Sequence, residues 1–317
     1  MRKISVILSF ILISVLSLAA CTGAGEDNEN KNLKEEKILV STTINPVDEI
    51  VNIIGKDKVE TNRMVPKGSD AHDFEPTIKD METLKNSKIL FINGLEMESW
   101  VEKAVEVSGN KKLEIIDLSK GVDLINLSEY DNGEDDDHSE EEDDDDHGHE
   151  HGKYDPHIWL SLNSLEVMSE NVYKELSSIS PEDENFFKEN LETFKKDILE
   201  VKDEYYKKFE PHKGKAFITG HAAFGYLTRE MGLVQKSIEG PFQEGEPTPK
   251  KLRDLIEYVK ENNITTIFLE QKASPRVSET LAREVNGKTV EINSLEDEGD
   301  ILDNLKIIYD KILESFN

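Results

Sequence analysis

Short strand-like runs alternate with helical patterns in two series along this chain, and one long helical segment separates the two series. The runs of the first series lie at 38–42, 58–64, 88–92 and 113–118, and those of the second at 215–219, 233–238, 264–269 and 289–292. Strands separated by helices of about ten residues are typical of right-handed βαβ units on a parallel sheet. The pattern therefore predicts an α/β protein with two lobes, each built on a mainly parallel sheet.

The long segment between the two series is expected to join the lobes. Pro181 and the acids after it are typical of a first helical turn, and apolar residues then recur at helical spacing as far as Phe209. Such a helix is either a coiled-coil partner or a rigid strut, and the strut is favoured because the α/β pattern resumes directly after it. The predicted domains are an N-terminal lobe at 37–180, a linking helix at 181–210 and a C-terminal lobe at 211–317.

The N-terminus has the form of a secretory signal peptide over residues 1–20, with a short basic stretch, an apolar stretch and small residues at its end. Cys21 follows directly, which resembles the lipobox of bacterial lipoproteins, in which this cysteine is lipidated. The alternative is an ordinary signal peptide with an incidental cysteine. Residues 21–36 are typical of a flexible tether, so we expect an extracytoplasmic protein that is lipid-anchored to the cell membrane. Cys21 is the only cysteine, which excludes an internal disulfide.

The segment 129–151, called the strap below, combines a run of acids with histidines. It has almost no apolar residues and its like charges repel, so it cannot pack into a core. It also carries much of the net charge of −29, which argues against nucleic acid and anionic lipid as partners. Imidazole and carboxylate are the groups that zinc prefers, although a solvated linker or a low-complexity insertion would look the same. The candidate auxiliary metal loop contains His138, His147, His149 and His151.

Four further side chains lie where ligands of an open α/β sheet are expected, beyond the carboxyl ends of strands. His72 lies in a turn-rich loop after the second predicted strand, and His157 follows Asp155 and Pro156. His221 and Glu270 come just past the ends of two apolar runs in the second series. Taken alone, His72 is more simply a surface histidine, and its place in the chain is what makes it a candidate.

Six segments in order resemble the zinc and manganese solute-binding lipoproteins of bacterial ABC importers. Each segment alone is weak, but the ordered set is specific and covers essentially everything after the tether. The resemblance implies two (β/α)4-type lobes, one long rigid linking helix, and a metal buried between the lobes. The segments lie at 68–76, 93–100, 155–160, 221–226, 246–248 and 267–270.

The resemblance also implies the metal ligands, which would be His72 and His157 from the first lobe and His221 and Glu270 from the second. Manganese-type members of the family carry a glutamate at the position of His221, so an imidazole there favours Zn²⁺. This agrees with the preference of zinc for imidazole and of manganese for oxygen. The fourth position stays open, because either Glu270 or a water molecule could fill it. Glu75 is a candidate for orienting an imidazole, although a merely solvated charge is the alternative.

From the resemblance we expect a monomeric, high-affinity zinc receptor that delivers Zn²⁺ to an ABC permease driven by a cytoplasmic ATPase. The alternatives are a manganese receptor of the same family and a surface adhesin. A secreted zinc hydrolase is a further rival, but the sequence contains no His-Glu-x-x-His motif and no serine or cysteine nucleophile motif. It also contains no Gly-x-x-x-x-Gly-Lys-Ser/Thr loop, so we expect no nucleotide hydrolysis. Because the hydrolase motifs are missing as well, we expect that the protein is not an enzyme.

Overall fold

The computed structural model describes residues 37–67, 69, 71–129, 152–243, 247–270, 275–295 and 299–317. The predictions of a signal peptide, of lipidation at Cys21, of the tether and of the four strap histidines lie outside these described residues. Residues 37–317 form one compact unit. Among its described residues, no helix has the length and apolar composition that crossing a membrane requires.

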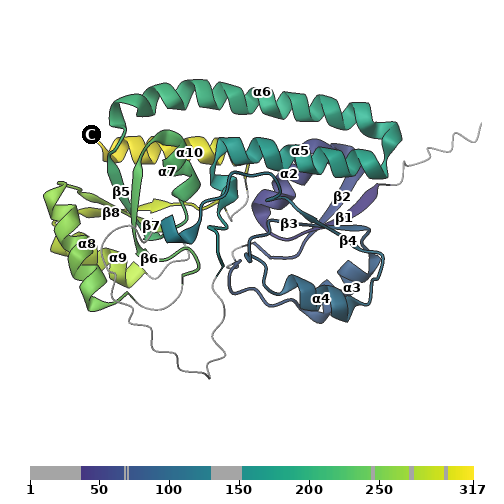
Figure 1. Cartoon of the computed structure of the whole chain (residues 1–317), viewed down its shortest axis with the longest axis horizontal. Helices are drawn as coiled ribbons and strands as arrows, with labels where there is room; N and C mark the ends of the chain where they lie inside the picture. Colours follow the sequence, from purple (N-terminus) through teal and green to yellow (C-terminus); the bar gives the residue numbers. More distant parts are fainter. Residues whose placement is uncertain are drawn as a thin grey trace, which may run out of the picture. The chain divides into compact units, whose positions relative to one another are not determined.

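The described residues contain two four-stranded sheets in which every strand pairing is parallel. The first sheet has the order β2-β1-β3-β4 and the second has the order β6-β5-β7-β8, so both follow the same plan (Figure 1). The prediction of two α/β lobes with parallel sheets is confirmed. The strands are β1 (Ile38–Thr42), β2 (Val59–Arg63), β3 (Ile89–Ile92), β4 (Glu114–Asp117), β5 (Ala216–His221), β6 (Val234–Glu239), β7 (Thr266–Glu270) and β8 (Lys288–Ile292).

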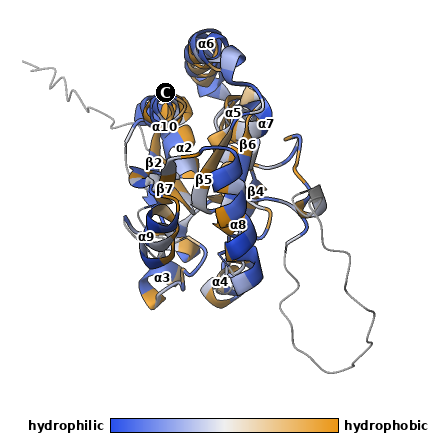
Figure 2. Cartoon of the chain, turned by 90° about the vertical axis from the view of Figure 1, so that its left-hand side faces the viewer, coloured by the Kyte–Doolittle hydropathy of each residue, from blue (hydrophilic) through white to orange (hydrophobic). Residues whose placement is uncertain are grey.

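Helices follow the strands, as the two series predict. The first lobe contains α2 (Asn45–Gly55), α3 (Ile78–Asn86), α4 (Val101–Ser108) and α5 (Leu162–Ile179). The second lobe contains α7 (Gly225–Met231), α8 (Pro249–Glu261), α9 (Pro275–Glu284) and α10 (Ile301–Ser315). Seen from the side in Figure 2, α8 is mainly hydrophilic, which agrees with its few buried residues.

A long helix, α6 (Glu184–Phe209), connects the lobes and lies along α5 and α10 (Figure 1). Its 26 residues span about 39 Å at the α-helical rise of about 1.5 Å per residue. One face is apolar at helical spacing from Phe187 to Phe209 and is buried, while charged residues occupy the other face. Because this face packs against helices of both lobes, α6 belongs to the main hydrophobic core of the molecule.

Some predicted boundaries are wrong, and the errors have local causes. The sequence pattern predicts a helix over 98–107, but α4 begins at Val101, because Leu95 and Glu96 adopt positive φ angles of 57° and 64° and form turns. His221 and Glu270, which we expected just past two strands, are instead the last residues of β5 and β7. The strands extend to these residues because β6 and β8 pair with them to the end.

The described residues on either side of the strap are paired with each other. Asn126 and Tyr154 form an antiparallel bridge, and the Leu127 amide donates to the Lys153 carbonyl at 3.0 Å. The Asp155 amide donates to the Ile125 carbonyl at 3.0 Å. The two chain segments that flank the strap therefore form a short hydrogen-bonded stem on the body of the first lobe.

Candidate metal site

Three imidazoles that are far apart in the sequence converge between the two lobes. The ligand atoms of His72, His157 and His221 all lie within 4.8 Å of one another, the only such group of three or more potential ligands among the described residues. The Nε2 atoms of His157 and His221 are 3.3 Å apart. The sequence-based expectation that these three side chains lie together therefore agrees with the geometry.

Each imidazole reaches this place from a different type of local structure. His72 lies in the loop between β2 and α3, and His157 directly precedes the short helical turn Ile158–Leu160. His221 ends β5, an inner strand of its sheet, so its side chain stands at the carboxyl edge, where α/β proteins bind ligands. His157 is fully buried and His221 is 2% exposed, whereas His72 is half-buried.

His157 is oriented by the acid two residues before it. Oδ1 of Asp155 accepts a hydrogen bond from the His157 amide at 2.9 Å and lies 2.8 Å from the His157 Nδ1 atom. A carboxylate at Nδ1 favours the tautomer that carries its proton there, which leaves the lone pair of Nε2 free for a metal. The carboxylate at His157 is that of Asp155, whereas Glu75, the sequence-based candidate for orienting an imidazole, is exposed and its role stays a prediction. The spacing of Asp155 and His157 was the sequence signal for this contact.

His221 has a carboxylate neighbour of the same kind. Oε1 of Glu270 accepts a hydrogen bond from the His221 amide at 3.1 Å, and Oε2 contacts Nδ1 of the His221 ring. Glu270 is 3% exposed and ends β7, the strand beside β5. Glu270 therefore lies on the Nδ1 side of His221 and outside the group of three converging ligand atoms. Its role as the fourth ligand stays a prediction.

The electrostatic environment keeps the His221 ring neutral. Burial is the largest cause that lowers the pKa of His221 well below its usual value of 6.5, and the neighbouring rings of His157 and His72 lower it further. A neutral imidazole is the form that binds a metal. The cluster is therefore able to bind a cation at neutral pH without first losing a proton from this ring.

A buried polar network supports the segment that carries His157. The Asn93 side chain donates to the Pro156 carbonyl at 2.9 Å. Glu98 in turn accepts hydrogen bonds from the amides of Asn93 and Gly94, at 2.8 Å and 3.0 Å, and from the Thr43 hydroxyl at 2.5 Å. Burial raises the pKa of Glu98 to about 7, against these three hydrogen bonds, which lower it. The resemblance included 93–100, but this supporting role was not evident from the sequence.

An aromatic side chain from the second lobe lies against the half-buried imidazole. The ring of Phe242 packs edge-on against His72 with the ring centroids 6.0 Å apart. Phe242 also fills the space beside Gly152, where an added Cβ would lie 2.7 Å from the Phe242 Cζ atom. Phe242 follows β6 and has no motif around it that singled it out in the sequence.

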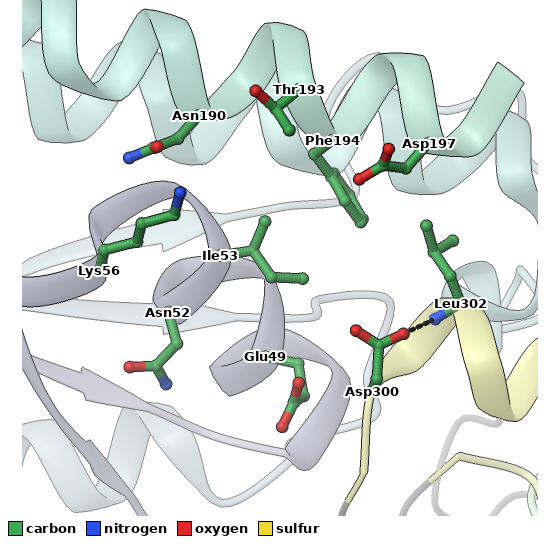
Figure 3. A pocket seen from close by; sticks show the side chains of 10 residues that line it. All are labelled: Glu49, Asn52, Ile53, Lys56, Asn190, Thr193, Phe194, Asp197, Asp300 and Leu302. Carbon is green, nitrogen blue, oxygen red and sulfur yellow. Dashed lines mark hydrogen bonds between the residues drawn. The ribbon is translucent and has the colours of Figure 1, made fainter. Parts of the chain in front are cut away.

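A separate cavity of about 320 Å³ lies among α2, α6 and the start of α10 (Figure 3). Its polar lining includes Glu49, Lys56 and Asp197, and Asp300 there caps α10 through the Leu302 amide at 3.0 Å. None of the three converging histidines lines it. The cavity therefore marks the joint between the linking helix and the two lobes, and it is distinct from the imidazole cluster.

Comparison with known proteins finds a family model and relatives that are described by zinc uptake or zinc binding. Residues 40–314 match the model of a family described as the zinc-uptake complex component A, periplasmic. The high-affinity zinc uptake system protein ZnuA of Bacillus subtilis is 33% identical over 287 residues, which cover 90% of this chain and 88% of that protein. The zinc-binding lipoprotein AdcA of Streptococcus pneumoniae is 31% identical over 298 residues, which cover 93% of this chain but 56% of AdcA.

A solved structure shows the same fold. The crystal structure of a Zn(II)-bound variant of AdcAII from Streptococcus pneumoniae superposes with a TM-score of 0.77 at 26% sequence identity. The superposition covers 89% of this chain and 99% of that chain. The two-lobed plan with a long connecting helix is therefore shared with a protein that binds zinc.

Proposed function

Because the chain belongs to the ZnuA family, the periplasmic component A of zinc-uptake complexes, we propose that it is a high-affinity extracytoplasmic Zn²⁺ receptor of an ABC importer. The observation that carries the proposal is the convergence of three imidazoles between the lobes. Zn²⁺ is the cargo of the protein, which it passes to a membrane permease.

The geometry of the imidazole pair supports zinc. Four ligands at about 2.0–2.1 Å in a tetrahedron place neighbouring nitrogen atoms about 3.3–3.4 Å apart. The Nε2 atoms of His157 and His221 lie 3.3 Å apart, which matches one edge of that tetrahedron. Three imidazoles also favour zinc over manganese, which prefers more oxygen ligands. We therefore propose His72, His157 and His221 as the three nitrogen ligands.

The fourth position is filled in one of two ways. Glu270 contacts the Nδ1 side of His221, so it orients this ring in the same way as Asp155 orients His157. Either a rotation of the Glu270 side chain toward the metal or a water molecule completes the tetrahedron. A Glu270→Gln variant separates these cases, because direct ligation predicts a larger loss of affinity than orientation alone.

The finer parts of the function follow from the family and the sequence. We propose that the chain is anchored through a lipid on Cys21, works as a monomer and catalyses no reaction. A metal held by three histidines and the Glu270 carboxylate leaves no open position for an activated water. The strap histidines then serve as weak, exchangeable sites that raise the zinc concentration near the lobes, with the strap carboxylates attracting the cation.

Native mass spectrometry of the protein purified without added metal tests the proposal. We expect wild-type protein to retain one tightly held zinc ion, and a His221→Ala variant to lose it. Competition against a chelator, with Zn²⁺ and Mn²⁺ in parallel, then ranks the two metals. Tighter binding of Mn²⁺ than of Zn²⁺, or zinc retained by the His221→Ala variant at wild-type affinity, would refute the proposed function.

A further inference from the structure

The hydroxyl of Tyr226 is buried where the two lobes meet. Tyr226 lies in the first turn of α7, five residues after His221, and is 1% exposed. Its hydroxyl donates a hydrogen bond to the Asp155 carbonyl at 2.8 Å and accepts one from the Ile125 amide at 3.2 Å. A side chain of the second lobe therefore holds the backbone of the first lobe on both sides of the strap stem.

Asp155 is the acid that orients His157, so this contact reaches the metal site. The Asp155 side chain holds the His157 ring, its amide donates to the Ile125 carbonyl, and its own carbonyl accepts from Tyr226. The position of the His157 ring therefore depends on a short backbone segment that Tyr226 fixes. Because Tyr226 follows His221 on the same rigid turn and helix, it also connects the two buried imidazoles.

The rest of α7 strengthens the same connection between the lobes. Arg229 donates to the Asp123 carbonyl and forms an ion pair with the Asp123 side chain. Glu230 accepts hydrogen bonds from the Leu162 amide at 2.8 Å and from the Tyr206 hydroxyl at 2.6 Å. The helix that follows His221 is thus bonded to residues before and after His157, and Tyr226 makes the contact nearest to that imidazole.

We propose that Tyr226 is a positioning residue that fixes the distance between the His157 and His221 nitrogens through Asp155, and thereby sets zinc affinity without contacting the metal. The proposal rests on the function proposed above. The Nε2 separation of 3.3 Å fits a zinc tetrahedron, so the free energy for bringing two buried imidazoles together is supplied by folding. Without the hydroxyl, the Asp155 segment relaxes. Part of the free energy that brings the two imidazoles together then has to be supplied by zinc binding, so zinc affinity falls.

The test compares Tyr226→Phe with a matched control in the full chain. Phenylalanine keeps the buried ring and removes only the hydroxyl. Tyr205→Phe makes the same chemical change in another buried tyrosine, which is 2% exposed and donates to Asp310 at 3.0 Å between α6 and α10. Tyr226→Phe loses the bond to the Asp155 carbonyl and the acceptor of the Ile125 amide, whereas Tyr205→Phe loses the bond to Asp310. Urea unfolding checks that both variants remain folded and measures how far each is destabilised.

Two measurements are made on each variant. Zinc affinity is obtained by competition with a chelator strong enough to strip the weak strap sites, and the visible spectrum of bound Co²⁺ reports the geometry of the ligand atoms. We expect Tyr226→Phe to bind zinc about tenfold more weakly, at the lower end of the range for loss of an outer partner of a metal ligand. We also expect the Co²⁺ bands to change, because the His157 nitrogen shifts. Tyr205→Phe should match wild type in both measurements.

The outcomes separate this inference from the proposed function. Wild-type affinity and an unchanged Co²⁺ spectrum in Tyr226→Phe would overturn the positioning role while the zinc site itself stands. Equal losses in both variants would also overturn it, because the effect would then be one of general stability. Failure of wild-type protein to hold zinc against the chelator would overturn the proposed function, and the positioning role with it.

Discussion

Replacing Asp155 by asparagine removes one negative charge next to His157 and leaves the shape of the site intact. One Asp155 oxygen accepts hydrogen bonds from the His157 amide at 2.9 Å and lies 2.8 Å from Nδ1, and neither residue is exposed. The asparagine oxygen is able to keep these bonds, but they become bonds to a neutral acceptor. Hydrogen bonds to charged groups contribute about 1.5–3 kcal/mol, against about 0.5–1.5 kcal/mol for neutral ones.

The difference of about 1–1.5 kcal/mol gives the expected effect on binding. Bound Zn²⁺ draws electrons from the His157 ring and strengthens its Nδ1–H bond to the carboxylate, so the loss is felt more in the zinc-bound state than in the free state. We therefore expect Asp155→Asn to weaken zinc binding by about tenfold, at the lower end of the 10–100-fold range for such partners.

Competition with a chelator at pH 7.5 measures the effect, and Asp300→Asn is the matched control. One Asp300 oxygen also accepts two backbone hydrogen bonds, from Leu302 at 3.0 Å and from Asp303 at 2.9 Å, but at the start of α10. Asparagine caps a helix as well as aspartate does, so this variant should resemble wild type. Zinc affinity within twofold of wild type in Asp155→Asn would refute the reasoning that the carboxylate acts on the metal through His157.

Three further predictions address pH, access and the strap. Because the pKa of His221 is lowered below 6.5 in the folded protein, the unfolded chain takes up this proton first, and metal-free protein should lose stability as pH falls below 6.5. Urea unfolding at pH 7.5 and 5.5 should show a smaller loss of stability in His221→Gln than in wild type. An equal loss in the two proteins would assign the effect to other groups. Phe242→Ala should speed zinc release several-fold in stopped-flow transfer to a chelator, because it uncovers His72; Phe316→Ala, which removes a ring stacked on His212 away from the cluster, is the control and should not change the rate. Deletion of residues 130–151 should leave one tight zinc site in calorimetry but slow zinc capture at low concentration, and loss of the tight site would show that the strap is the principal binding element.

The fold was largely predictable because its signals are local. Strand-like runs between helical patterns located all eight strands of the described residues to within a few residues. The inner strands β1, β3, β5 and β7 were the clearest, since buried parallel strands have little freedom in composition. The start of α4 was missed because Leu95 and Glu96 adopt positive φ angles, in a turn where the Asn93 and Gly94 amides donate to the Glu98 carboxylate. Neither residue is of a type that favours that conformation.

The site was predictable only where family resemblance supplied long-range information. His157 and His221 carry no local signal that they meet, and their convergence depends on how two sheets and α6 are packed. The contacts of Tyr226 and Phe242 were harder still to predict, because each side chain contacts a residue of the first lobe that lies far away in the sequence. Metal binding by His72, His157, His221 and Glu270 remains a prediction for the experiments above.

The paired stem below the strap makes this point of the chain suitable for engineering. Asn126 and Tyr154 face each other across a bridge, and backbone hydrogen bonds join their neighbours, so the two ends of the strap leave the lobe side by side. A foreign module, such as a fluorescent protein, could be grafted there with its termini side by side. Its base would stand on the same backbone that carries Asp155, so a graft at this point is a natural starting design for a zinc biosensor.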